Sequence, residues 1–254
     1  MTAMIDHRGP DDRGMYIEDG AGLGHARLSI LDVAGGHQPL SNEDGTLWIT
    51  FNGEIFNYIE LREELIRKGH RFRTKTDTEV ILHLYEEEGA DAVRRLNGQW
   101  ALGIWNTQSR TLFLSRDRMG IRPLFYTVAG RELLFASEIK ALLAHPEVSR
   151  EIDPESLDNI FTCWTTLEPR TFFRNIRSLP PGSSLVWRNG HIDVSRYWRP
   201  TYAAIACPTS ADESADALRA RSPLMFFSGT NFERPTASVS SSASATFASS
   251  ISAT

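Results

Sequence analysis

The feature that most constrains the fold is a series of short segments rich in strand-forming residues and separated by Gly, Asn and Asp. Alternation and β-branched or aromatic content predict strands in such segments. The last two flank Asn189-Gly190, which is the strongest short signal for a β-hairpin. The predicted strands are residues 24–31, 47–51, 99–105, 111–115, 124–128, 133–136, 185–187 and 191–194.

Helices are fewer. Residues 58–68 place apolar side chains on one helical face, and Gly69 follows where a helix commonly ends. Thr76 and Glu79 have the spacing of a capping box ahead of a second apolar stripe. A third, short helix is expected at 138–143. Strands therefore outnumber helices between about Gly22 and Tyr202.

Composition excludes several classes of protein. The 254 residues are 41% hydrophobic with a net charge of −5, which is typical of a soluble chain with one sizeable core. Lys and Arg are scattered, whereas nucleic-acid binding needs a basic face. No apolar run is long enough for a membrane span or a signal peptide, so a cytoplasmic location is expected. Cys163 and Cys207 have no metal-type spacing, and we expect both to be unreactive.

The C-terminal part has a different character. From Thr236 to Thr254 nearly every residue is Ser, Ala or Thr. Such a segment buries too little apolar area to offset an ordering cost of roughly 1–2 kcal/mol per residue. We therefore predict an ordered domain over 1–205, and a linker remnant with a disordered tail over 206–254.

The motifs between His7 and Trp198 occur in one order and together resemble the class II glutamine amidotransferase domain of asparagine synthetases. This resemblance implies an α+β fold, an N-terminal-nucleophile αββα sandwich of two antiparallel sheets between helical layers. It also implies glutamine as the substrate. The motifs are HRGPDD, RLSILD, GGHQPL, NGEIFN, TDTEVILHLYEE, LNGQWALGIWN, SRDRMGIRPLFY, FASEIKALL and LPPGSSL.

The resemblance also implies residue roles. Arg27 matches the arginine that binds the glutamine α-carboxylate, a task suited to a planar guanidinium. The alternative is an arginine on a strand surface. The neighbouring residues Leu28, Ser29, Ile30 and Leu31 would line the same pocket mainly through their backbone.

Asn52 and Gly53 match the family oxyanion hole, in which one such donor is worth about 3–4 kcal/mol. The alternative for this pair is a simple turn. Glu54 and Asp77 match the acidic residues that receive the substrate α-ammonium group. Asp77 has a second interpretation, a negative charge favoured at a helix N-terminus, and both roles can hold together.

The chain departs from the family pattern at both ends. Family members begin with a cysteine whose thiol is the nucleophile and whose amine is the base. Here Met1 falls inside the helix that precedes HRGPDD, so the fold is expected to lack its first strand and the chain to have no glutaminase activity. Thr2 is a poor substitute because it lies too close to HRGPDD. The ATP-binding SGGxDS loop is replaced by SPLMFFSGTNFERP, so no cofactor is expected in this chain, and ATP and Mg belong to the missing synthetase domain.

Alternatives stay open. The chain could be a non-catalytic, amidotransferase-like scaffold or partner-binding module, or a relative with a different acceptor. Residues 116–118 are expected to form a structural charged network rather than to catalyse. His7, Arg8 and Asp11 receive no role, and neither the acceptor nor the oligomeric state follows from the sequence.

Overall fold

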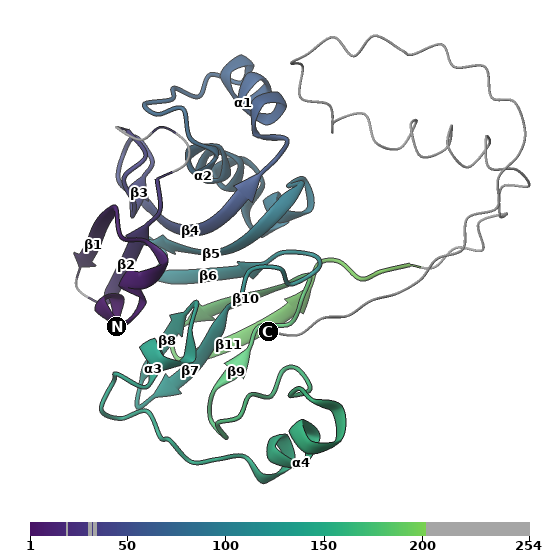
Figure 1. Cartoon of the computed structure of the whole chain (residues 1–254). Coiled ribbons are helices and arrows are strands. Elements are labelled where there is room, and N and C mark those ends of the chain that lie inside the picture. Colours follow the sequence, from purple (N-terminus) through teal and green to yellow (C-terminus); the bar gives the residue numbers. More distant parts are fainter. Residues whose placement is uncertain (19, 30–31, 33–34, 202–254) are drawn as a thin grey trace, which may run out of the picture. The chain divides into compact units, whose positions relative to one another are not determined.

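Six antiparallel strands form the central sheet in the order β11-β10-β6-β5-β4-β3 (Figure 1). The computed structural model describes residues 1–18, 20–29, 32 and 35–201, and the first compact unit is Met1–Thr201. The strands are β3 (Leu40–Ser41), β4 (Leu47–Ile55), β5 (Gly98–Asn106), β6 (Thr111–Arg116), β10 (Ser183–Arg188) and β11 (His191–Arg196).

A second strand layer consists of two smaller sheets. One pairs β1 (Asp12–Glu18) with β2 (Ala21–Arg27), and the other has the order β8-β7-β9. Their remaining strands are β7 (Phe125–Ala129), β8 (Glu132–Ala136) and β9 (Arg177–Ser178). Among the described strands, β2 pairs only with β1, and β8 pairs only with β7. Each therefore keeps one edge without a partner strand.

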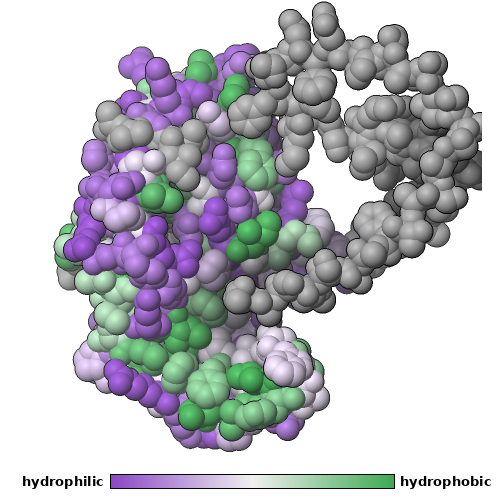
Figure 2. Space-filling model, viewed as in Figure 1, coloured by the Kyte–Doolittle hydropathy of each residue, from purple (hydrophilic) through white to green (hydrophobic). Residues whose placement is uncertain are grey.

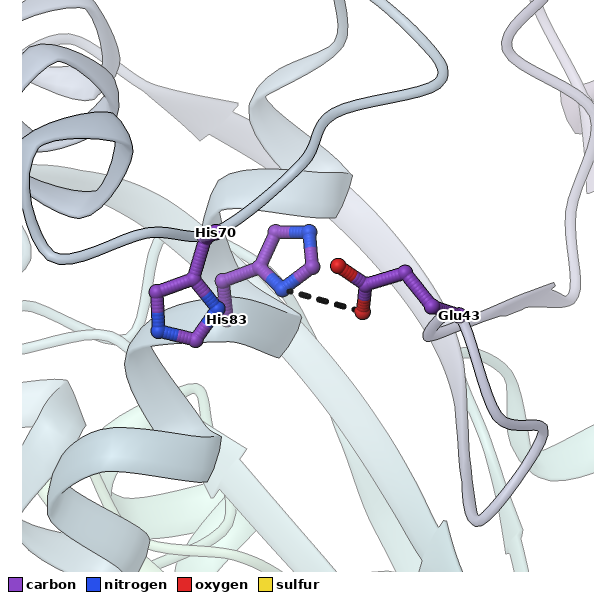
Figure 3. A group of neighbouring side chains, drawn as sticks. All are labelled: Glu43, His70 and His83. Atoms are coloured by element: carbon purple, nitrogen blue, oxygen red, sulfur yellow. Dashed lines mark ion pairs between the residues drawn. The ribbon is translucent and has the colours of Figure 1, made fainter.

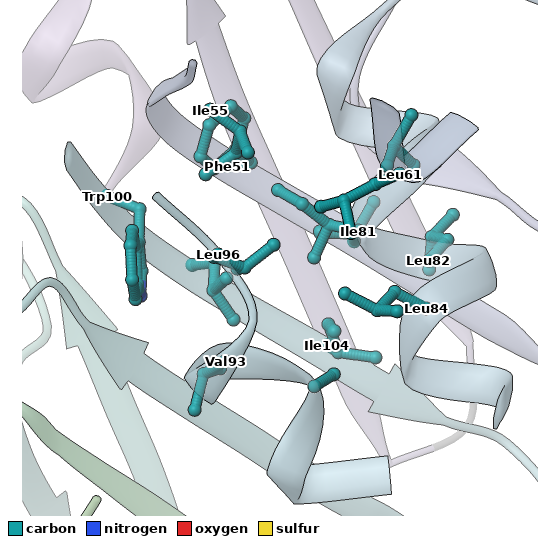
Figure 4. Close-up of a cluster of buried hydrophobic side chains, with 14 of the residues drawn as sticks. Phe51, Ile55, Leu61, Ile81, Leu82, Leu84, Val93, Leu96, Trp100 and Ile104 are labelled. Atoms are coloured by element: carbon teal, nitrogen blue, oxygen red, sulfur yellow. The ribbon is translucent and has the colours of Figure 1, made fainter. Parts of the chain in front are cut away.

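The middle of the central sheet is buried on both faces, as β5 shows. Trp100, Leu102 and Ile104 pack into a core with side chains from the helical layer, which comprises α1 (Tyr58–Arg67), α2 (Asp77–Glu88) and η2 (Gly89–Arg94) (Figure 4). Ala101 and Trp105, which alternate with them, join a second core that includes side chains from the smaller sheets. This alternation makes β5 the boundary between two cores.

A small outer layer completes the sandwich. α3 (Ile139–Leu142) packs against β7 and β8 through a third apolar cluster. η1 (Thr2–Arg8) contacts β2 and α3. α4 (Pro154–Cys163) presents exposed apolar side chains, which gather at one end of the face shown in Figure 2. The order helices, sheet, sheets, helix is the αββα arrangement expected from the sequence.

Several local predictions are confirmed. α1 ends at Arg67 with Lys68 as its C-cap. At the start of α2 the Thr76 hydroxyl accepts a hydrogen bond from the Glu79 N–H at 3.3 Å, which is one half of a capping box. The Glu79 carboxylate accepts from the Arg73 and Thr74 N–H groups instead of from Thr76. Asn189 and Gly190 have φ of 50° and 81°, the two positive values that a two-residue hairpin turn needs.

Other predictions differ from the structure. The strand predicted over 24–31 ends at Arg27, because the Ser29 N–H donates to the Asp11 carboxylate at 2.8 Å instead of to a strand. Ile30 and Leu31 lie outside the described residues, as do the tail and the boundary predicted at 205. β1 and α4 were not predicted, although Asp153 and Pro154 carry the cap and first-turn signals of α4.

Candidate functional site

A cavity of about 820 Å³ opens beside the central sheet. Its walls come from β2, β4 and β5, from the first residues of α2, and from β8. Five of the residues predicted for glutamine binding or catalysis line it together with Leu28: Arg27, Asn52, Gly53, Glu54 and Asp77. Segments that are up to 50 positions apart in the sequence therefore meet at one place, with polar groups from three elements.

Arg27 is the last residue of β2 and is only 5% exposed. Its Nη2 donates a hydrogen bond to the Asp32 carbonyl oxygen at 2.9 Å. The Asp32 carboxylate in turn accepts the Lys75 N–H at 2.9 Å, which ties this loop to the segment before α2. A Cβ at Gly36 would collide with the Arg27 guanidinium, so a glycine is needed there to let the loop approach it. The loop that follows β2 thus holds the Arg27 guanidinium in position.

Asn52, Gly53 and Glu54 lie inside β4, opposite Ala101, Trp100 and Gln99 of β5. The turn interpretation of Asn52-Gly53 is therefore wrong for this fold. The backbones approach so closely at Gly53 that an added Cβ would overlap the Gln99 carbonyl oxygen. A regular strand at this point fixes the orientation of both the Asn52 amide and the Gly53 backbone.

Asp77 is the first residue of α2 and is 5% exposed. Its Oδ2 accepts the Ile55 N–H at 3.0 Å, which joins the helix to the end of β4. Burial raises the pKa of this carboxyl and the charge of Glu54 adds to the rise, whereas backbone hydrogen bonds from Ile55 and Thr78 oppose it. A bound cation would favour the ionised form of such a group.

His25 also lines the cavity and was not singled out from the sequence. Its Nδ1 lies 3.1 Å from the Thr50 hydroxyl, and the ring shares one face of β2 with Arg27. Burial lowers the pKa of His25 to about 4, and the Arg27 charge contributes to the decrease. The imidazole is therefore neutral near pH 7. Alternation along β2 was the one signal that could have placed His25 beside Arg27.

Several other sequence-derived residues lie outside this polar group. His7 and Arg8 contact the Glu138 carboxylate at 3.0 and 3.2 Å, although Arg8 also reaches the cavity wall. Arg116 donates to the Glu168 carboxylate and to the backbone of neighbouring loops, which fits the structural network expected for residues 116–118. Cys163 is exposed on α4 and is not part of the cavity wall, and Cys207 lies outside the described residues.

The glutamine amidotransferase domain family matches residues 1–198. The chain belongs to this family. It is 43% identical over 206 residues to asparagine synthetase [glutamine-hydrolyzing] 1 of Bacillus subtilis (strain 168), a match that covers 81% of this chain and 32% of the relative. A second relative from that organism, asparagine synthetase [glutamine-hydrolyzing] 3, is 40% identical over 201 residues, with 78% and 33% covered. The predicted relation to the amidotransferase domain of these synthetases is confirmed, and the chain spans about a third of their length.

A solved structure supports the fold. This chain matches the structure of the glutamine phosphoribosylpyrophosphate amidotransferase from B. subtilis with a TM-score of 0.51 and 23% identity. The match covers 70% of this chain and 35% of that one. At this identity the likeness shows a shared fold and nothing finer. Within the described part of the chain, no helix is long and apolar enough to cross a membrane.

Proposed function

We propose that this amidotransferase domain binds glutamine in the cavity and forms the site at which its side-chain amide is hydrolysed. The observation that carries the proposal is the convergence of Arg27, Asn52, Gly53, Glu54 and Asp77 on one cavity. A free amino acid carries an anionic carboxylate and a cationic ammonium group, and the cavity offers a partner of opposite charge for each.

In this proposal Arg27 binds the α-carboxylate, while Asp77 and Glu54 bind the α-ammonium group. The ammonium charge would favour the ionised form of Asp77, whose pKa burial raises. Neutral His25 lies beside Arg27 without adding a second positive charge. The carboxylate would therefore be bound by one guanidinium rather than by a diffuse cationic patch.

The chemical step needs an oxyanion hole and a nucleophile. The cysteine thiol gives its proton to the amine of the same residue, and the thiolate attacks the amide carbon. The Asn52 amide and the Gly53 N–H stabilise the oxyanion that forms. The amine then returns the proton to the leaving nitrogen, so that ammonia departs and a thioester remains. Water then releases glutamate. Both proposed donors lie on β4, where pairing with β5 fixes them before substrate arrives.

The remaining cavity wall suggests how the thiol is brought to these donors. β2 and β8 both line the cavity, and each has an edge without a partner among the described strands. One further strand that paired with both edges would join the two smaller sheets and fill the space between them. We propose that an N-terminal strand of the family type, beginning with cysteine, takes this place.

The acceptor reaction is a further part of the proposal. By analogy with the asparagine synthetases, the ammonia would be passed on for ATP-dependent amidation of aspartate, with ATP and Mg bound by the part of those relatives that this chain does not span. A cytoplasmic location stays a prediction. A second candidate is a non-catalytic, amidotransferase-like scaffold or partner-binding module, which is favoured by the position of Cys163 outside the cavity.

Extension of the chain with a Cys-Gly-Ile strand and a connecting loop tests these candidates. We expect the extended protein, with cysteine as its first residue, to release glutamate from glutamine, and the same protein with serine at that position to release none. In calorimetry Arg27→Ala should weaken glutamine binding, whereas Arg150→Ala, at an exposed position, should leave it unchanged. A folded, cysteine-initiated protein that binds glutamine but releases no glutamate would favour the non-catalytic module.

A further inference from the structure

A second polar cluster lies away from the amidotransferase cavity, where three segments meet. Glu43 comes from the turn between β3 and β4, His70 from the loop after α1, and His83 from the middle of α2 (Figure 3). A ligand atom of each lies within 4.8 Å of those of the other two. None of the three lines the amidotransferase cavity.

A fourth side chain reaches the same point. Glu86, one turn after His83 on α2, places its Oε2 at 2.7 Å from the His83 Nδ1 and at 3.5 Å from the His70 Nδ1. The Glu43 Oε2 lies 3.7 Å from the His83 Nδ1. The His83 Nδ1 therefore has one oxygen of Glu86 and one of Glu43 beside it, and the same Glu86 oxygen lies next to the His70 Nδ1.

We propose that Glu43, His70, His83 and Glu86 form a binding site for one divalent transition-metal ion of the zinc type. Zinc in proteins takes four nitrogen, oxygen or sulfur ligands at about 2.0–2.2 Å, which puts neighbouring ligand atoms roughly 3.3 Å apart. The separations of 3.5 and 3.7 Å are close to this value. The Glu86 carboxylate needs to withdraw by about half an ångström from His83 to make room for the ion.

The outer contacts of the four side chains favour a metal site over a chance group of charges. The His70 imidazole turns its second nitrogen toward another carboxylate, because its Nε2 lies 3.1 Å from Glu87. The His83 Nε2 is 3.8 Å from the Glu79 carboxylate, which is too far for a hydrogen bond. Metal-binding histidines commonly have such a carboxylate on the far nitrogen, because it fixes the ring and the tautomer.

The carboxylates are positioned in the same way. The Glu43 Oε1 accepts the Arg71 N–H at 3.3 Å, and the Glu86 Oε1 accepts from the Asn42 amide at 2.6 Å. In each case one oxygen is held by the protein and the other faces the two histidines. Three of the four proposed ligands, His70, Glu43 and Glu86, are thus oriented by hydrogen bonds to partners outside the site.

Ligand type and charge select the ion. Two imidazoles disfavour Mg²⁺ and Ca²⁺, which prefer oxygen ligands, and suit zinc, copper, nickel or iron. Two carboxylates balance the charge of a divalent ion. The His83 side chain is 0% exposed whereas that of Glu43 is 41% exposed, so the site is buried at His83 and open to solvent at Glu43. A bound ion would fasten the β3–β4 turn and the loop after α1 to α2.

Metal titration of the full chain, freed of affinity tags and treated with a chelator, tests the proposal. Calorimetry with ZnCl₂ should give one ion per chain, and zinc in about hundredfold excess over its Kd should raise the Tm by roughly 5 °C, whereas MgCl₂ should not. Co²⁺ should give the visible absorption of a tetrahedral ion. His70→Gln and Glu43→Gln should each weaken zinc binding at least tenfold, because each removes one ligand.

His70 and Glu43 lie in loops, so their variants are expected to fold, which circular dichroism will check. His145→Gln is the matched control, because His145 also faces a carboxylate, Glu132 at 3.9 Å, far from the cluster in sequence. Zinc binding that is equal in the wild type and in the His70→Gln/Glu43→Gln double variant would overturn the proposal. So would the absence of any zinc-dependent rise in Tm.

Discussion

His25 should make the stability of this amidotransferase domain depend on pH in a defined window. Burial beside Arg27 lowers the pKa of its imidazole from 6.5 to about 4. Between these values the unfolded chain takes up a proton that the folded chain does not, so the free energy of unfolding decreases as the pH falls from about 6.5 to 4. Below pH 4 His25 is protonated in both the folded and the unfolded chain, so it causes no further decrease in the free energy of unfolding.

The magnitude follows from the shift. At about 1.36 kcal/mol per pKa unit, the pH change from 7 to 5 costs about 2 kcal/mol, and the full window costs about 3 kcal/mol. Urea unfolding followed by tryptophan fluorescence at pH 7, 6 and 5 measures this cost. His25→Gln keeps a polar partner for Thr50 but cannot titrate. Between pH 7 and 5 the free energy of unfolding should therefore fall by about 2 kcal/mol more in the wild type than in the variant.

Other titrating groups are common to both proteins, so they cancel in this difference. His191→Gln, at an exposed position of the β10–β11 hairpin, is the control and should behave as the wild type. Equal pH dependence in the wild type and in His25→Gln would show that the His25 imidazole is not held neutral beside Arg27.

Four further substitutions probe the site and its frame. Gly53→Ala should lower the free energy of unfolding by about 3 kcal/mol, because the new methyl group meets backbone of β5; Gly22→Ala, with nothing within 4 Å, should cost far less in the same urea assay. Thr76→Ala removes the cap of α2 and should cost about 1 kcal/mol, and no loss would mean that the cap is dispensable. In the cysteine-extended protein, Asn52→Ala should lower kcat by roughly 10² to 10³ with KM little changed, and a change in KM alone would argue against an oxyanion role. Arg27→Ala should chiefly raise the KM for glutamine, and an unchanged KM would exclude it as the carboxylate partner.

Local signals in the sequence located most of the fold. The N-cap at Thr76 and the Asn189-Gly190 turn depend on hydrogen bonds and φ angles within four residues, so they could be predicted without knowledge of the rest of the chain. β1 was missed because its apolar residues, including Met15 and Ile17, are exposed and its polar residues interrupt the pattern. The end of β2 was misplaced because the side chain of Asp11, 18 positions away from Ser29, decides it.

The residues of the candidate site were predicted from the family resemblance more than from the physical properties of the residues themselves. Asn-Gly after a strand is an ordinary turn signal, and only the pairing with β5 shows that Asn52 and Gly53 continue β4. His25 carries no motif, and its neutral imidazole follows from burial that exists only after β2 and β4 come together. The cluster of Glu43, His70 and His83 joins three segments, so neither metal-type spacing nor helical periodicity could indicate it.

Asp77 combines two tasks in one carboxylate. One oxygen fastens the first turn of α2 to Ile55 at the end of β4, and the group also lies in the wall of the proposed glutamine site. A substitution of Asp77 that changes the charge presented to a ligand therefore also removes a hydrogen bond that connects α2 to β4. Ligand recognition and folding therefore cannot be changed separately at Asp77. A variant with another residue here, selected to bind a different amino-acid ligand, would need a new contact elsewhere along α2 to keep the helix attached to the sheet.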